Sequence, residues 1–400
     1  MERIIYRELK STPQVWGLLA LLAAFVAAAG AVVLYIEHYG HIVTGMNNQI
    51  VWGLPHVFAI FLIVAASGAL NVASIGSVFG KVAYKPMARI SALLAIALLV
   101  GGLAVLVLDL GRPDRLIVTM THFNFKSIFT WNILLYTGFM AIVAVYIYTQ
   151  MARGLPSYAV KVAGLAAFVW RLILTTGTGS IFGWLVAREA YDSAVMAPLF
   201  IVMSFATGMA IFLLVVMGIT TMTGRDFGPQ LRTRLASLLA IFIAAVLYFT
   251  AVQHLTNMYA AEHWGVETFI LRDGGIYTVL FWGVQVLIGG LLPMAILFAP
   301  KLVKQARMVI LASSLVIIGG FAQLYVIVVG GQAYPLDIFP GYEISSSFSD
   351  GVINAYTPNI LEVILGFSGV ALALAIVIIG MKFLRILPNS LSDANVSAKS

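Results

Sequence analysis

Ten long runs of mostly apolar residues constrain the fold of this chain more than any other feature. A helix needs ~20 such residues to cross the hydrocarbon core of a bilayer, and alternating segments typical of a membrane β-barrel are absent. The sequence therefore predicts an all-α integral membrane protein with about ten transmembrane helices. The runs lie near 15–37, 55–79, 88–109, 128–150, 160–186, 196–220, 235–257, 276–299, 307–329 and 360–383.

Composition supports one polytopic membrane domain over residues 1–400. Hydrophobic residues make up 61% of the chain and charged residues 10%, whereas soluble domains carry about 25% charged residues. Ten spans leave room for two four-helix bundles plus two peripheral helices. The polar residues 386–400 predict a disordered tail.

The distribution of Lys and Arg predicts how the chain is oriented. The two termini and the even-numbered gaps between spans hold 17 basic residues, and the odd-numbered gaps hold 5. Because basic loops stay on the cytoplasmic side, we expect both termini in the cytoplasm and the chain in the cytoplasmic (inner) membrane. The net charge of +7 reflects this anchoring, and nucleic-acid binding is not needed to explain it.

Most acids and all histidines fall near the outer ends of the predicted spans. All six histidines and 12 of the 16 acids lie there. A transmembrane haem pair would need histidines at both depths, so the pattern argues against a b-type cytochrome. A single haem between His56 and His254, or a metal at the outer histidines, stays an alternative. The chain has no cysteine, which excludes cysteine-bound iron–sulfur clusters within it.

The stretch "LDLGRPDRLIVTMTHFNFKSIFTWN" concentrates charge between two apolar runs. Asp109 ends the third span, and Pro113 prevents the helix from continuing. In one interpretation Arg112 pairs with Asp109 or Asp114 and only clamps the loop. In the other, Asp109, Arg112 and His122 face an apolar slot together with His56. Such a slot suits a quinone, which needs hydrogen-bond partners, proton exchange and lipid for its tail.

Three motifs give this chain a resemblance to the NrfD/PsrC family of quinone-reactive membrane subunits. They are "DLGRPDR" followed by "HFNFKSIFTWN", "WGLPHVFAIFLIVAASGAL" on the second span and "TTGTGSIFGWLVAREAYDS" on the fifth. The stretch "VVGGQAYPLDIFPG" is most similar to the DsrP branch, from a membrane complex linked to dissimilatory sulfite reductase. The family motif carries over to Asp109, Gly111, Arg112, Pro113 and Arg115.

The resemblance implies a function. The chain would exchange electrons and protons between menaquinone or ubiquinone and an extracytoplasmic ferredoxin-like iron–sulfur subunit. It would hold no haem or iron–sulfur cluster itself, and it would assemble with a cytochrome and further membrane subunits. We predict a site with Asp109, His56 and His122 as proton-exchanging residues. Arg112, Asn124 and Arg115 complete the predicted quinone contacts, and no metal is expected.

Two other functional classes remain open from the sequence. A secondary transporter would place charges near the midplane, where Arg171 is the one strong candidate. Arg171 either extends to the inner surface or pairs within the bundle. A purely structural anchor is the second alternative. The mid-span residues Gln253, Gln285 and Gln323 are expected to form hydrogen bonds between helices.

Overall fold

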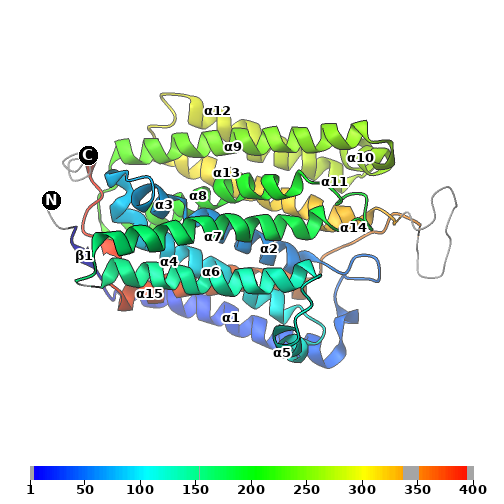
Figure 1. The fold of residues 1–400 in the computed structure, drawn as a ribbon, viewed down its shortest axis with the longest axis horizontal. Coiled ribbons are helices and arrows are strands. Elements are labelled where there is room, and N and C mark those ends of the chain that lie inside the picture. The colour runs from blue at the N-terminus through cyan, green and yellow to red at the C-terminus, as the bar shows by residue number, and fades with distance from the viewer. Residues whose placement is uncertain (1–3, 153, 337–350, 394–400) are drawn as a thin grey trace.

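The computed structural model describes residues 4–152, 154–336 and 351–393 as a bundle of long helices (Figure 1). Within these residues, ten helical segments are long and apolar enough to span a membrane. This confirms the predicted fold class. The segments are Pro13–Tyr39 (α1), Leu54–Ser77 (α2, α3), Val82–Leu108 (η2, α4), Ile128–Met151 (α6), Ser157–Gly183 (α7), Met196–Thr223 (α8), Pro229–Tyr259 (α9), Ile276–Phe298 (α11, η6, α12), Ala306–Ala333 (α13, η7, α14) and Ile360–Phe383 (α15).

Several spans are built from consecutive helical pieces. The composite spans consist of α2 Leu54–Ala69 with α3 Asn71–Ser77, η2 Val82–Met87 with α4 Ala88–Leu108, α11 Ile276–Val279 with η6 Leu280–Leu291 and α12 Leu292–Phe298, and α13 Ala306–Tyr325 with η7 Val326–Gly330 and α14 Gly331–Ala333. Of these pieces, η6 and η7 are π-helices. The short connecting helices are η1 His41–Val43, η3 Pro113–Arg115, α5 Leu116–Thr121, η4 Ala261–His263, α10 Trp264–Thr268 and η5 Phe269–Asp273.

The second span lies at the centre of the molecule. Its most apolar stretch is 94% buried, whereas that of α1 is 17% buried. The α2 helix packs against α4, α7, α8, α13 and α15. Its approach to α8 is close, because a Cβ on Gly68 would lie 1.6 Å from the carbonyl oxygen of Ser204. The grouping into two four-helix bundles and two peripheral helices stays a prediction.

Both termini lie at the same end of the bundle (Figure 1). Strand β1, Tyr6–Arg7, pairs antiparallel with β2, Leu387–Pro388. Residues 386–393, which the sequence assigns to a disordered tail, therefore pack against the bundle instead. The reason is that Ile386, Leu387 and Leu391 are apolar and become buried. Residues 394–400 lie outside the described residues.

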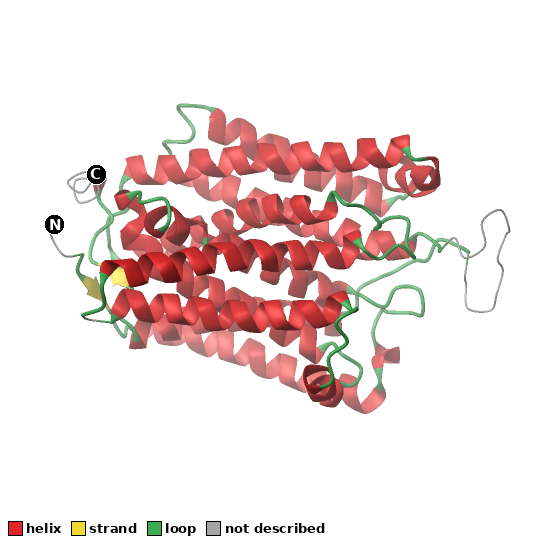
Figure 2. Ribbon diagram, in the orientation of Figure 1, coloured by secondary structure: helices red, strands yellow, loops and turns green. Residues whose placement is uncertain are grey.

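The longer connections gather at the opposite end of the bundle, where α5 and α10 lie (Figure 2). The segment 330–358, which the sequence predicts as a long outer loop between the ninth and tenth spans, belongs to this end. The ninth span continues to Ala333, so this loop is shorter than predicted. Its central part, 337–350, lies outside the described residues.

Candidate functional site

Two of the predicted site residues, His56 and Asp109, meet at the end of the bundle that carries α5. His56 lies in the first turn of α2, and Asp109 is the residue at which α4 ends. The Nδ1 atom of His56 lies 2.5 Å from Oδ2 of Asp109. The two side chains are 12% and 1% exposed. A carboxylate at Nδ1 fixes the ring and leaves Nε2 as the atom that a ligand can reach.

Buried polar atoms without a partner lie at and near this pair. Among the described residues, Oδ1 of Asp109 and Nδ1 of His41 are buried and form no hydrogen bond. His41 lies beside Gly111, where a Cβ would approach Cδ2 of His41 to 3.7 Å. Buried polar atoms are normally bonded. Their lack of partners indicates a place for a ligand or for water.

An aromatic wall covers His56. Trp52 stacks on the His56 ring at 6.2 Å between centroids and on Tyr191 at 6.4 Å, with an interplanar angle of 21° in both cases. Phe129 lies edge-on to Trp52 at 6.3 Å and is 46% exposed. The aromatic wall therefore extends from the partly buried imidazole of His56 to the exposed apolar surface at Phe129.

The last span holds the start of α2 in place. Glu362 of α15 is fully buried and accepts hydrogen bonds from the backbone N–H of Gly45 and of Asn359 at 2.9 Å. It also accepts the Tyr356 hydroxyl at 2.6 Å, and that hydroxyl accepts the N–H of Leu54 at 2.6 Å. Burial and the Glu362 hydrogen bond raise the pKa of Tyr356, so Tyr356 stays protonated. Glu362 is thus a positioning residue for the helix that carries His56.

The remaining predicted site residues lie in an exposed loop, apart from the pair. Arg112 donates to Asp114 through Nε and Nη2 at 2.9 and 2.8 Å, and these hydrogen bonds hold the pKa of Asp114 below its ordinary value. Of the two acids that the sequence offers as partners of Arg112, the structure therefore shows Asp114. His122 bonds to Thr121. Asn124 and Arg115 are exposed as well, and Asn124 accepts the N–H of Lys126.

A second histidine–carboxylate pair, which the sequence does not predict, lies in the other half of the chain. Nδ1 of His254 lies 2.6 Å from Oε2 of Glu267, and Asn257 donates to Oε1 of the same carboxylate at 2.9 Å. Glu267 is 3% exposed. Glu262, an acid nearer in sequence, has a side chain that is 77% exposed and lies beside His263.

Arg171 is buried within the bundle and does not reach a membrane surface. It is 3% exposed. It donates to the Asn71 side chain and, at 3.2 Å, to the carbonyl of Ser67, and the rings of Phe168 and Phe205 flank it. Of the two interpretations of this residue, pairing within the bundle is therefore confirmed.

The described residues contain no group of three or more His, Cys, Asp or Glu side chains placed to hold a metal ion. Each of the two pairs joins a partly buried imidazole to a buried carboxyl group. Fold and site together define a polytopic helical membrane protein with two histidine–carboxylate pairs near one end.

Comparison with known proteins places the chain in a family. The model of the family "Polysulphide reductase, NrfD" matches residues 42–335. Because this match covers well over half of the chain, the protein belongs to the NrfD family, as its motifs predict.

Three named relatives resemble nearly the whole chain. The Hdr-like menaquinol oxidoreductase integral membrane subunit of Archaeoglobus fulgidus is 29% identical over 94% of each chain. A putative membrane subunit of dimethyl sulfoxide reductase from Halobacterium salinarum is 26% identical over 92% of this chain and 90% of its own. A selenate reductase subunit of Mesobacillus selenatarsenatis is 24% identical over 85% of this chain and 87% of its own.

Proposed function

We propose that this chain is the quinone-reactive membrane subunit of a multi-subunit oxidoreductase, with its site at His56 and Asp109. The observation that carries the proposal is the buried pair itself, with an unbonded carboxylate oxygen beside an aromatic wall that reaches the lipid-facing surface. The three relatives, all named as subunits of an oxidoreductase or reductase, support this function over a transporter.

The residues fit the head group of a quinol. Such a ligand supplies two electrons and two protons when it is oxidised. Nε2 of His56 can accept a hydroxyl hydrogen bond and then the proton, while Asp109 at Nδ1 stabilises the resulting imidazolium. The Oδ1 atom of Asp109 has no bonded partner among the described residues, so it can accept a hydrogen bond from the second hydroxyl group and then the second proton. Trp52 and Phe129 place aromatic surface next to His56, against which the ring of the quinol can pack.

The electrons need an acceptor or donor outside this chain, and we propose an extracytoplasmic iron–sulfur subunit. The chain has no cysteine to ligate such a cluster. The exposed loop with Arg112, Arg115 and Lys126 lies at the same end as the pair and offers a surface for that partner. This orientation rests on the predicted cytoplasmic termini, at the other end of the bundle.

The particular quinone and complex are also proposals. The menaquinol named for the Archaeoglobus relative favours menaquinone over ubiquinone. The DsrP branch and a sulfur-metabolising complex with a cytochrome remain predictions from the sequence, as do further membrane subunits.

Asp109→Asn tests the site, because it keeps the shape of the side chain and removes its charge. We expect quinone-linked electron transfer by the assembled complex to fall at least 100-fold, which corresponds to roughly 2.7 kcal/mol of transition-state stabilisation. His56→Gln should act in the same way. The measurement is quinol oxidation or quinone reduction by the purified complex, with subunit content checked by gel filtration. Normal turnover and quinone affinity in both variants would exclude this site.

A further inference from the structure

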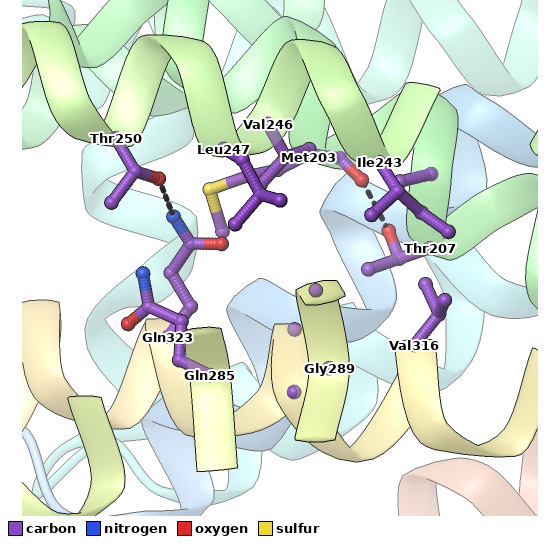
Figure 3. Close-up of a pocket in the computed structure, with 14 residues that line it drawn as sticks. Met203, Thr207, Ile243, Val246, Leu247, Thr250, Gln285, Gly289, Val316 and Gln323 are labelled. Carbon is purple, nitrogen blue, oxygen red and sulfur yellow. Dashed lines mark hydrogen bonds between the residues drawn. The ribbon is translucent and has the colours of Figure 1, made fainter. Parts of the chain in front are cut away.

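Size and charge distinguish a pocket at the terminal end of the bundle from the internal cavity in Figure 3. The internal cavity has a volume of about 30 Å³, and none of the described residues that line it is charged. The terminal pocket, formed by residues from the segments 7–15 and 222–225 and by Asn389, has a volume of about 280 Å³. Its described lining includes three basic residues, Arg7, Lys10 and Arg225, and no acidic one. The terminal pocket therefore offers space and positive charge for an anion.

Distant parts of the chain build the terminal pocket. Arg7 lies on β1, whose partner strand β2 belongs to the C-terminal segment. Gly224 ends α8 with a φ of 63°, and the next residue, Arg225, donates from Nη1 to the carbonyl of Pro388 at 2.7 Å. The N-terminal segment, the loop after α8 and the C-terminal segment thus hold the basic side chains around one space.

The positive charge of the terminal pocket is not neutralised by the protein. None of the three basic residues forms a salt bridge with an acid in the part of the chain that the structure describes. Glu8 pairs with Arg385 instead, at 3.2 Å, and Asp226 is exposed and does not line the pocket. Burial and then the charge of Arg7 lower the pKa of Arg225, yet an arginine stays charged in proteins. Because like charges repel each other, a bound anion would stabilise this arrangement.

The depth of the terminal pocket fits the head group of a lipid. Thr12, the N-cap of α1, lines the pocket, so the pocket lies at the positive end of that helix dipole. Met222 and Thr223 belong to the last turn of α8. The ends of two spans therefore border the pocket, as expected at the surface of a bilayer. Met222 and Trp16 are 55% and 57% exposed and provide apolar surface beside it for acyl chains.

We propose that the terminal pocket binds the phosphate group of an anionic phospholipid. The planar guanidinium groups of Arg7 and Arg225 suit phosphate oxygens, and Lys10 adds a third positive charge. Basic pockets between spans on the cytoplasmic side bind such head groups, and the distribution of basic residues predicts that this end is cytoplasmic. The site lies at the end of the bundle opposite to the His56–Asp109 pair and shares no residue with it, so it goes beyond the proposed function.

The test counts bound lipids on the purified full-length chain. The chain in detergent is titrated with phosphatidylglycerol, and native mass spectrometry identifies each bound molecule by its mass. We expect the first phosphatidylglycerol to bind about tenfold more tightly than phosphatidylcholine, which carries a phosphate but no net charge. Replacing Arg7→Gln and Lys10→Gln together should weaken phosphatidylglycerol binding about tenfold or more, because two charged donors are lost. This double variant keeps Arg225 and its hydrogen bond to Pro388, so the pocket stays folded.

A matched control removes the same charge outside the terminal pocket. Lys301 and Arg307 are exposed and do not line it, so Lys301→Gln with Arg307→Gln should leave the affinity for phosphatidylglycerol unchanged. An equal loss of affinity in the two double variants, or no loss in either, overturns the proposal. Binding of phosphatidylcholine as tight as that of phosphatidylglycerol also overturns it. An adduct with the mass of inorganic phosphate that forms at the same concentration would assign the pocket to a free anion and overturn the lipid.

Discussion

Asp109 and Arg112 are three positions apart in the chain, yet their surroundings differ completely. Asp109 ends α4 and is 4% exposed, whereas the Arg112 side chain, beyond the turn, is 63% exposed. The buried carboxylate meets an imidazole, and the exposed guanidinium meets the carboxylate two residues away. An exposed ion pair contributes little to stability, so the two residues of this motif have different roles.

Arg112→Ala should therefore have a small effect on this subunit itself. We expect the midpoint of thermal unfolding of the purified complex to stay unchanged within error and its KM for quinol to stay within about twofold. Thermal denaturation and steady-state kinetics measure the two quantities. A loss of quinol turnover as large as that of Asp109→Asn, in a complex that stays assembled, would support the predicted role of Arg112 as a quinone contact.

Part of the candidate site could be predicted because the order and direction of the spans determine how deep each residue lies in the membrane. His56 and Asp109 fall at the outer ends of adjacent spans, and two such groups can meet. The sequence does not predict Glu267 as the partner of His254. The chain turns back between Tyr259 and Trp264, and the spacing of the two residues in the sequence does not reveal this turn. The partner of Arg112 is not predictable from residue spacing, because Asp109 and Asp114 are both near it in the chain and only the structure shows that it pairs with Asp114.

At the scale of elements, the buried carboxylate of Glu362 joins three parts of the molecule. It closes the N-terminus of α15 in a capping box with Asn359. It also binds the loop at Gly45 and, through Tyr356, the first residue of α2. The close fit is visible at Gly53, where a Cβ would lie 2.6 Å from Oε1 of Glu362.

Glu362→Ala should destabilise the protein and disturb the site at a distance. Two backbone N–H groups and one hydroxyl would lose their acceptor. At ~1–3 kcal/mol for each unbonded buried group, the three groups together correspond to a loss of about 3–9 kcal/mol. Thermal denaturation of the purified complex measures it, with Glu262→Ala, an exposed acid, as the control. A variant with wild-type stability and turnover would show that the loop at Gly45 and helix α2 keep their positions without this carboxylate.

The spans themselves were predictable because length and hydropathy determine what a bilayer accepts. The exact ends of the spans were harder to predict than their positions. The α9 helix begins at Pro229, six residues before the predicted run, because its first turns are polar and still helical. The π-helix η6 could not be predicted from hydropathy, because a π-turn and an α-turn can both be formed by the same apolar residues.

At the scale of the whole molecule, the two termini lie together and the histidine pairs lie at the other end. The 17 basic residues on the terminal side, against 5 on the other, predict that the termini face the cytoplasm. A C-terminal alkaline phosphatase fusion should then be inactive in cells, and a fusion of a fluorescent protein that folds only in the cytoplasm should be bright. The opposite pattern would reverse the orientation of both proposed sites.

The anchoring of α2 by Glu362 has a consequence for biogenesis. The residue that fixes the start of the second span is supplied by the tenth, more than 300 positions later. During synthesis, His56 and Asp109 enter the membrane long before their support exists. The first half of the nascent subunit must therefore stay in the membrane without the Glu362 contacts until the last helix inserts. A quality-control protease that recognises a loose segment between the first two spans would thus remove chains that terminate early, before they reach a partner.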